Sequence, residues 1–387
     1  MSSRRQFGRF CLSALLCAPA FRLAQADPLI EGSGNVRWRH FTQRMRQQVI
    51  SPYGQPVRIL QLGDSHTAGN HFPDRIRHRL QYTFGNGGVG LIPPGRIGRM
   101  PSSGVLVTPA PQWTMRQLRP REPRDEGGRP VAGLGGFVGH GLSAYQTIRY
   151  EFTGLTGPLR FFIYFDGYDL DPPFFKLYQG QQERRPVDEK IAGRSVFQLP
   201  ATKELSLLAR GKGDQARLFG VTALSKQPGV VFSSIGLNGA SLSTLLEWDN
   251  AVTHWQVNDY APDLLILAFG TNDVVNINFV PEKFQQNLQE TAAWVERHAP
   301  EAAVLLLLPP HTPLHGPKTH HDLGTARTLM SRFAVQQGWR SWDWSAVTMA
   351  QGMSMFQADG IHLTQQGYEK SGEALAKAII ASLHQRF

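Results

Sequence analysis

The stretch that decides the fold is Val57–Leu62 (VRILQL), which runs directly into residues 63–66 (GDSH). A short apolar run that ends at turn residues predicts a buried strand rather than a helix. One apolar residue in every four then marks a single helical face: Phe72, Ile76, Leu80 and Phe84. A strand, a turn and a helix in that order predict the first unit of an α/β sheet.

The same pattern returns in the last third of the chain. Asp263–Phe269 and Ala302–Leu308 are continuous apolar runs, typical of parallel strands that are covered on both faces. Between them, Pro281–His298 has helical spacing of apolar residues and a proline in its first turn. A last helix is expected over about Gln365–Gln385. We therefore expect an α/β fold with a parallel sheet flanked by helices.

The middle of the chain, from about Arg96 to Lys226, has no long helical period. It contains strand-like runs separated by Gly, Pro and charged turns: Thr147–Phe152, Leu159–Phe165, Phe174–Tyr178, Ser195–Leu199, Glu204–Ala209 and Ala216–Leu224. Such runs predict an all-β sandwich inserted into the α/β domain. The expected division is 27–95 and 229–387 for the two parts of the α/β domain, and 96–228 for the insert.

Residues 1–26 are predicted to be a removable export signal. They hold four arginines and no acidic residue, an apolar run over Phe10–Phe21 and the small-residue cleavage site Ala24-Gln25-Ala26. The apolar run is too short for a membrane span, which needs about 20 residues. The paired arginines leave the general and the twin-arginine export routes open. We expect an exported chain without an integral membrane segment after removal of the signal.

Composition excludes several classes of protein. The chain has 387 residues, 41% of them hydrophobic, which excludes a disordered protein. Only two cysteines are present, Cys11 and Cys17, both within the predicted signal, so a disulfide framework is excluded. The formal charge is +10. However, the basic run Arg116–Arg124 contains Glu122 and lacks aromatic interleaving, so no nucleic-acid partner is expected.

Ser65 and His362 lie where nucleophilic catalysis would need them. Ser65 is at a strand-to-helix turn, which exposes a hydroxyl and offers unpaired backbone N–H groups. Asp359 precedes His362 by three residues across a glycine turn, so its carboxylate could orient the imidazole. Taken alone, each pattern also fits an ordinary turn or helix cap.

Two further turns offer uncharged hydrogen-bond donors. Asn272 follows the run Asp263–Phe269, and its side-chain amide could donate to a developing oxyanion. Either Gly236 or Gly239, after the run Val230–Ile235, could supply a backbone N–H. The strand ends of an open α/β sheet share one crevice. The serine, the histidine and these donors together form the parts of an acyl-transfer site.

The ordered blocks GDSH, NGAS, GTND and DGIH resemble those of the SGNH (GDSL-type) hydrolases, which centre on Ser, Gly, Asn and His. The resemblance implies the flavodoxin-like fold of that family. It also implies that Ser65 is the nucleophile, His362 the base and Asp359 its partner. The oxyanion donors would be Ser65, Gly239 and Asn272, and Gly239 is preferred to Gly236 because a small polar pair follows it. No metal or organic cofactor is implied.

An insert between the serine and glycine blocks resembles the architecture of Gram-negative peptidoglycan O-acetylesterases. This resemblance implies a periplasmic serine esterase that removes 6-O-acetyl groups of muramic acid. The partner would be the O-acetylated glycan strands, the insert would be carbohydrate-binding-like, and the chain would act as a monomer. An O-acetyltransferase or a deacetylase acting on another exported polysaccharide is the alternative.

Several other residues are interpreted as structural. His311, His315, His320, His321 and Asp322 could ligate a metal, but nearby Pro and Gly predict a flexible loop beside the site. Trp113 and Trp248 lie outside clear strands. The aromatic residues of the insert could stack on sugar rings, although their spacing fits the core of a sandwich better: Tyr164, Phe165, Tyr168, Phe174, Phe175 and Tyr178.

Overall fold

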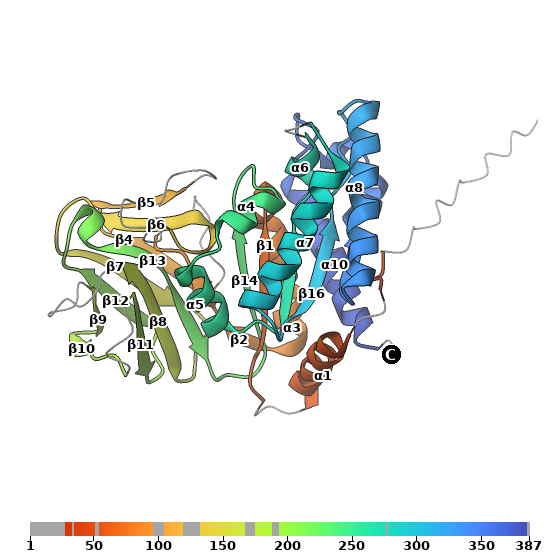
Figure 1. Ribbon diagram of the computed structural model, residues 1–387. Helices are drawn as coiled ribbons and strands as arrows, with labels where there is room; N and C mark the ends of the chain where they lie inside the picture. The colour runs from red at the N-terminus through yellow and green to blue at the C-terminus, as the bar shows by residue number, and fades with distance from the viewer. Residues whose placement is uncertain are drawn as a thin grey trace, which may run out of the picture.

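The computed structural model describes residues 28–32, 35–50, 54–95, 104–118, 132–166, 175–187, 193–275 and 278–384. The predicted export signal lies outside these residues, as does most of the basic run Arg116–Arg124. The chain forms an α/β domain and a β-sandwich that lie side by side (Figure 1). This arrangement confirms the predicted fold class.

A six-stranded parallel sheet forms the centre of the α/β domain. Its strands are β1 (Val57–Gly63), β2 (Asn86–Gly88), β14 (Val230–Gly236), β15 (Leu264–Ala268), β16 (Ala303–Leu308) and β17 (Arg340–Asp343), in the spatial order β17-β16-β15-β1-β14-β2. Gly63 of β1 pairs with Gly236 on one side and with Ala268 on the other. The strands that follow β1 in the sequence therefore lie on both sides of it. Open α/β sheets bind ligands at such a switch point, at the carboxyl ends of the strands.

Helices cover both faces of the parallel sheet. One face carries α1 (Val36–Ile50), α3 (His71–Phe84), α9 (Trp344–Gln351) and α10 (Gln365–Ser382). The other carries α5 (Ala251–Tyr260), α7 (Pro281–His298) and α8 (Pro317–Gln336). Ile59 packs against the first layer and Leu60 against the second, as expected for successive residues of a strand.

Shorter helices lie mainly at turns. They are α2 (Ser65–Ala68), α4 (Leu242–Glu247), α6 (Thr271–Val275), and the 3₁₀ turns η1 (Leu134–Gly136), η2 (Gly213–Gln215) and η3 (Met353–Met355). The predicted helix over Pro281–His298 is present with those bounds. The four apolar residues expected on one face of α3 are all buried.

Two antiparallel sheets form the sandwich, with the orders β10-β9-β12-β7-β4 and β11-β8-β13-β6-β5, and β3 pairs with β13. Their strands are β3 (Gly90–Ile92), β4 (Val105–Pro109), β5 (Trp113–Gln117), β6 (Phe137–Gly141), β7 (Gln146–Phe152), β8 (Leu159–Asp166), β9 (Phe175–Gln179), β10 (Gln182–Arg184), β11 (Arg194–Leu199), β12 (Glu204–Ala209) and β13 (Arg217–Ser225). The predicted boundaries at 96 and 228 stay predictions.

Aromatic residues of the sandwich divide between core and surface. Tyr164 and Phe175 are buried, Tyr178 is partly exposed, and residues 168 and 174 lie outside the described residues. The pattern around Trp113 predicts no strand, but Trp113 begins β5 and is buried. Its indole N–H donates to Pro94 O at 2.8 Å, a contact that no local pattern of the sequence reveals.

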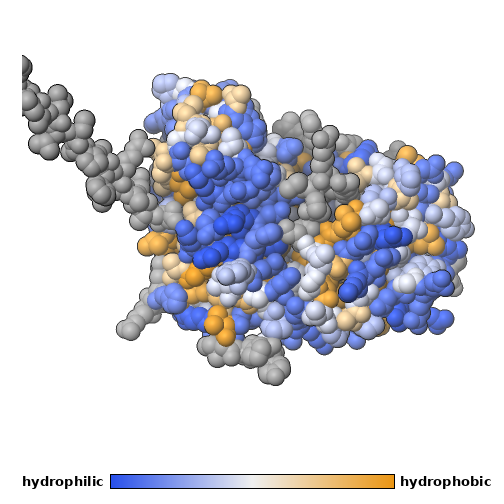
Figure 2. Space-filling model, turned by 180° about the vertical axis from the view of Figure 1, so that it is seen from behind, coloured by the Kyte–Doolittle hydropathy of each residue, from blue (hydrophilic) through white to orange (hydrophobic). Residues whose placement is uncertain are grey.

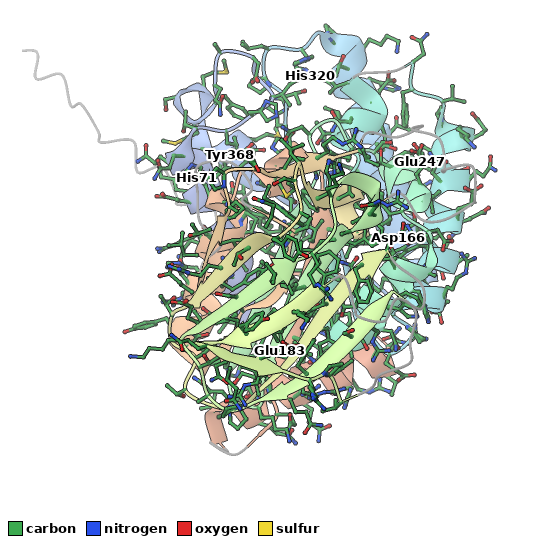
Figure 3. The ribbon with its side chains drawn as sticks, turned by 90° about the vertical axis from the view of Figure 1, so that its left-hand side faces the viewer. His71, Asp166, Glu183, Glu247, His320 and Tyr368 are labelled. Atoms are coloured by element: carbon green, nitrogen blue, oxygen red, sulfur yellow. The ribbon has the colours of Figure 1, made fainter. Side chains whose placement is uncertain are left out.

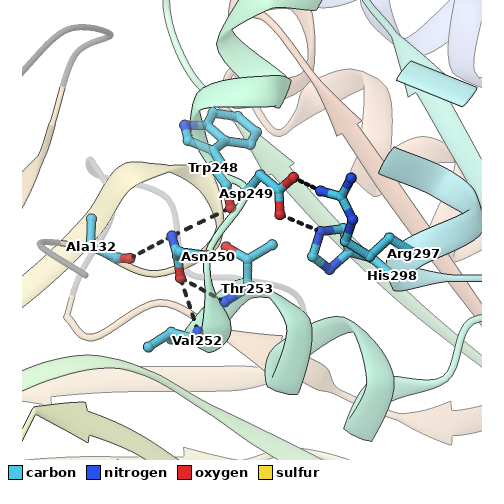
Figure 4. A network of polar contacts seen from close by, with 8 residues as sticks. All are labelled: Ala132, Trp248, Asp249, Asn250, Val252, Thr253, Arg297 and His298. Carbon is cyan, nitrogen blue, oxygen red and sulfur yellow. Dashed lines mark hydrogen bonds and ion pairs between the residues drawn. The ribbon is translucent and has the colours of Figure 1, made fainter. Parts of the chain in front are cut away.

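The sandwich shares a hydrophobic core with the α/β domain through α5. Gln256 of α5 accepts a hydrogen bond from the N–H of Leu134 at 2.7 Å and donates to Phe219 O at 3.1 Å. Asn250, which caps α5, donates to Ala132 O at 3.4 Å (Figure 4). The insert is therefore joined to the α/β domain by packing and hydrogen bonds, in addition to the covalent connections.

The surface seen from behind is mainly hydrophilic, with hydrophobic residues in small separate patches (Figure 2). Seen from the sandwich end, Glu183 and Asp166 mark the sandwich, while His320 and Tyr368 belong to helices of the α/β domain (Figure 3). Among the described residues, no helix has the length and apolar character needed to cross a membrane.

Candidate active site

Ser65 lies at the tight turn between β1 and α2. Asp64 caps α2, and its carboxylate accepts a hydrogen bond from the N–H of His66 at 3.0 Å. A side chain at Gly63 would meet Thr67 Oγ1 at 2.3 Å and Ala268 O at 2.7 Å, so the turn requires glycine there. Ser65 is consequently the first residue of a helix at the carboxyl end of the central strand, and it is partly exposed.

His362 joins Ser65 to Asp359. Its Nε2 lies 2.7 Å from Ser65 Oγ, and its Nδ1 lies 2.6 Å from Asp359 Oδ2. The other oxygen of Asp359 accepts hydrogen bonds from the N–H groups of Ile361 and His362, both at 2.9 Å. Three residues that span 297 positions of the sequence thus form one continuous hydrogen-bonded row. Such a row can move a proton from the hydroxyl to the imidazole.

Asp359 is held in its charged form. Its partial burial raises the pKa, but the hydrogen bonds from the His362 side chain and from two backbone N–H groups outweigh that effect and lower the pKa to about 2. The carboxylate therefore stays ionised over the neutral range. A charged Asp359 favours the Nδ1–H tautomer of His362, which leaves Nε2 free to accept the serine proton.

Gly239 and Asn272 meet at the neighbouring turn. Gly239 is exposed and has a φ of +79°, and open space surrounds the position that a side chain would occupy. Asn272 lies on α6, directly after β15, and its amide donates to Ala240 O at 2.9 Å. The structure thus places Asn272 beside the Gly239 turn and both at the strand ends that flank Ser65.

Gly236, the other candidate glycine, has a packing role. A side chain there would come within 2.2 Å of the Ala68 N atom and 2.7 Å of the Thr67 carbonyl carbon. The absence of a side chain lets β14 lie close to α2, whose first residue is Ser65. Gly236 is thus enclosed by backbone, whereas Gly239 lies in open space, so Gly239 is the better candidate of the two for a site residue.

Two buried carboxyl groups support these turns. Asp64 and Asp273 are 1% and 3% exposed. Burial raises the pKa of each to about 7, although Asp64 accepts from the N–H of His66 and Asp273 from that of Leu242. Each carboxyl thereby accepts from the first turn of a short helix, α2 or α4, where backbone N–H groups lack partners within the helix. Sequence patterns assign no role to either residue.

His66 lies beside the site, and the sequence patterns assign it no role. It is 2% exposed, and its Nδ1 lies 2.9 Å from the hydroxyl of Tyr368, which also bonds the backbone of Leu363. Burial is the main cause that lowers the pKa of His66 to about 3, and the neighbouring imidazole of His362 is a further cause, so His66 is neutral. Tyr368 thereby links His66, which follows Ser65, to Leu363, which follows His362. In the sequence, the signal that points to His66 is its place as the last residue of the block GDSH.

The histidines after β16 differ from their prediction. His320 and His321 belong to α8 rather than to a loop, because Pro317 occupies the first turn of that helix, where proline is favoured. The rings of His311 and His320 lie 4.9 Å apart, and His320 Nε2 is 2.8 Å from Thr312 O. No group of three or more metal-ligating residues occurs in the described part of the chain.

The loop between β16 and α8 nevertheless borders the candidate triad. A side chain at Gly360 would meet Leu314 Cβ at 2.5 Å, and Gly360 has a φ of +65°. Both observations require glycine between Asp359 and His362. Leu314 itself is 57% exposed, so it forms part of the surface beside Asp359 and His362.

Comparisons with known proteins found a structure with the same overall architecture. A structure of a peptidoglycan O-acetylesterase superposes with a TM-score of 0.76 at 21% identity and covers 92% of this chain and 99% of that chain. A lipase/acylhydrolase from Enterococcus faecalis shares 22% identity, with a TM-score of 0.32 over 42% of this chain and 80% of that one. A family two carbohydrate esterase from Clostridium thermocellum shares 13% identity, with a TM-score of 0.32 over 63% and 94%. No significant match was found among curated protein sequences.

The match with a TM-score of 0.76 shows that the two chains share a fold, which here is a parallel α/β sheet with an inserted all-β domain. Residues 208–370 match the sequence model of the GDSL-like lipase/acylhydrolase family, so this part of the chain is similar to that family. The matched stretch includes Gly239, Asn272, Asp359 and His362. It begins at residue 208, within β12 of the sandwich, so Ser65 lies outside it.

Proposed function

We propose that the chain is a serine esterase that removes O-acetyl groups from peptidoglycan, at the 6-hydroxyl of muramic acid. The observation that carries the esterase proposal is the row Ser65–His362–Asp359, with contacts of 2.7 and 2.6 Å. It occurs at the switch point of an acylhydrolase fold. The proposed substrate rests on likeness to a peptidoglycan O-acetylesterase across the α/β domain and the insert together.

In the first half of the reaction, Ser65 Oγ attacks the carbonyl carbon of the acetyl ester, and its proton passes to His362 Nε2. The carbonyl oxygen becomes an oxyanion, which the N–H groups of Ser65 and Gly239 and the amide of Asn272 stabilise. The intermediate collapses by breaking the bond to the sugar oxygen. That oxygen takes the proton from His362 and leaves as the free 6-hydroxyl, while the acetyl group stays on Ser65.

In the second half, water attacks the acetyl carbon and gives a proton to His362, and the same donors hold the second oxyanion. The bond to Ser65 Oγ then breaks, Ser65 regains its proton from His362, and acetic acid leaves and releases its proton to water as acetate. Asp359 stays ionised throughout, because its pKa of about 2 lies far below the neutral range. It stabilises His362 while the imidazole is charged.

The proposed place of action is the periplasm of a Gram-negative cell, with O-acetylated glycan strands as the partner. The composition of residues 1–26 supports export. We propose the inserted sandwich as a carbohydrate-binding-like part of the enzyme.

The proposal is tested by incubating the purified protein with O-acetylated peptidoglycan and measuring the acetate released. Chemically de-acetylated peptidoglycan is the substrate blank, and Ser65→Ala is the enzyme control. The wild type is expected to release acetate from the acetylated polymer, and loss of Ser65 is expected to slow release by roughly 10⁴-fold or more. Equal release by the wild type and Ser65→Ala would exclude the proposed function.

The substrate is tested in the same assay with acetylated xylan and with an added de-acetylated glycan acceptor. Faster release from xylan than from peptidoglycan would contradict the proposed substrate and favour a deacetylase of another polysaccharide. Appearance of acetyl groups on the added acceptor, in place of free acetate, would instead identify an O-acetyltransferase.

A further inference from the structure

Gln117, the last residue of β5, connects the inserted sandwich to the candidate oxyanion site. Its side-chain amide nitrogen donates to Gly135 O at 3.0 Å and to Gly236 O at 2.9 Å. Gly135 belongs to the insert, whereas Gly236 ends β14 of the parallel sheet. One partly buried amide therefore makes one hydrogen bond within the insert and one to the parallel sheet.

The acceptor Gly236 begins the turn that carries Gly239. On one side of this turn, the N–H of Leu237 donates to Gly63 O at 3.1 Å, just before the nucleophile turn. At its end, Ala240 O accepts from the amide of Asn272 at 2.9 Å. Hydrogen bonds within the α/β domain thus hold the turn against β1 and α6. A hydrogen bond from the sandwich holds its first residue.

Apolar packing holds the insert against the same turn. Ile235 and Leu237 flank Gly236 and belong to one core cluster with Leu118, Leu134 and Phe137 of the insert. A side chain at Gly135 would come within 2.3 Å of Ile235 Cγ2, so the close approach at this point requires glycine. Because packing alone does not fix a carbonyl direction, the hydrogen bond from Gln117 supplies the directional contact.

We propose that Gln117 is a positioning residue that orients the Gly236–Ala240 turn so that the Gly239 N–H points at the oxyanion. This inference rests on the proposed function. Loss of the amide leaves two inward carbonyl groups without their donor, and the turn can then rotate. A donor aimed at the oxyanion matters most in the transition state, so the change lowers kcat more than it raises KM.

The test compares Gln117→Met, which keeps the length of the side chain but cannot donate, with Gln146→Met. Gln146 is a matched control, because its amide also donates to two acceptors in the insert, Ser143 Oγ and Ala144 O, away from the turn. With a small soluble acetyl ester, Gln117→Met is expected to lower kcat by about 10-fold, less than deletion of an oxyanion donor. KM is expected to stay within about two-fold, as for loss of a contact made only in the transition state.

Gln117→Glu provides a second readout. Its ionised carboxylate would face two carbonyl oxygens, whereas its protonated form regains one donor. The ratio of its kcat to that of the wild type should therefore rise as the pH is lowered. A merely structural role would lower thermal stability and leave this ratio flat.

An unchanged kcat in Gln117→Met, an equal loss in Gln146→Met, or a ratio for Gln117→Glu that does not change with pH would overturn the inference. These outcomes require an active wild type, so they differ from failure of the proposed function, in which the wild type itself hydrolyses no acetyl ester.

Discussion

The carboxyl edge of the parallel sheet and the inserted sandwich contribute to the candidate site in different ways. The sheet edge gathers Ser65, Gly239 and Asn272 from the ends of three adjacent strands, and His362 completes the row from the loop before α10. The sandwich supplies no group of the triad. It contacts the turn that carries Gly239 through buried apolar residues and through the amide of Gln117, which donates to Gly236 O.

The difference separates chemistry from support. Groups on the sheet edge are partly exposed and polar, whereas the sandwich meets the turn through buried apolar residues and one amide. Substitutions at the sheet edge should therefore change the rate without loss of folding. Substitutions in the sandwich should change stability first, except at Gln117.

Apart from loss of Ser65 itself, the largest effect is expected for Asn272→Ala. Removing one oxyanion donor costs roughly 10²–10³ in kcat. The control is Asn86→Ala, because Asn86 lies on the edge strand β2 and its side-chain oxygen accepts from the N–H of Gly88. Steady-state kinetics on a small acetyl ester measure both variants. Equal rates for Asn272→Ala and Asn86→Ala would place the oxyanion donor elsewhere.

Leu207→Ala tests the sandwich side of the comparison. Leu207 is fully buried in the sandwich core on β12. Deletion of this side chain should lower the free energy of unfolding by about 2–5 kcal/mol. The kcat of the folded protein should not change, because Leu207 belongs to a different core cluster from the residues around the Gly236–Ala240 turn. Denaturant unfolding and kinetics well below the transition measure the two quantities, and a fall in kcat that matches the loss of stability would contradict the separation.

Asp273→Asn tests the buried support on the sheet side and is expected to have the smallest effect. Burial raises the pKa of Asp273 from 3.8 to about 7 in the folded protein, so the folded state holds a proton that the unfolded chain releases. This contribution to stability is complete below about pH 4 and is lost as the pH rises to about 7. Asparagine does not titrate and keeps an oxygen for the N–H of Leu242.

The wild type should therefore lose stability relative to Asp273→Asn between about pH 4 and 7, by on the order of 1–3 kcal/mol. Denaturant unfolding at several pH values measures the difference. Parallel pH profiles of the two proteins would show that Asp273 does not bind the proton on folding.

Much of the fold could be predicted because its main strands and three of its helices, α3, α7 and α10, have simple patterns. The runs that form β1, β15 and β16 are largely or wholly apolar, and α3 has one apolar face. Helix α5 has no such face. It buries polar side chains such as Thr253 and Gln256 together with apolar ones, because the sandwich covers it and accepts a hydrogen bond from Gln256.

The candidate site could be predicted in part. Ser65, Gly239, Asn272, Asp359 and His362 each lie in a recognisable turn block. The first three follow predicted strands and the last two precede a predicted helix, and these positions are local properties of the sequence. The links from His66 to Tyr368 and from Gln117 to Gly236 span 302 and 119 positions. Such contacts depend on tertiary packing, and no local pattern encodes them.

Whether Ser65 carries the acetyl group during turnover can be measured directly. The enzyme is mixed rapidly with an activated acetyl ester and quenched in acid, and the mass of the peptide that contains Ser65 is determined. We predict that this peptide gains the mass of one acetyl group in the wild type and that the corresponding peptide of Ser65→Ala gains none. Release of acetate at an undiminished rate by Ser65→Ala, with no acetylated peptide in the wild type, would contradict a serine nucleophile at this position.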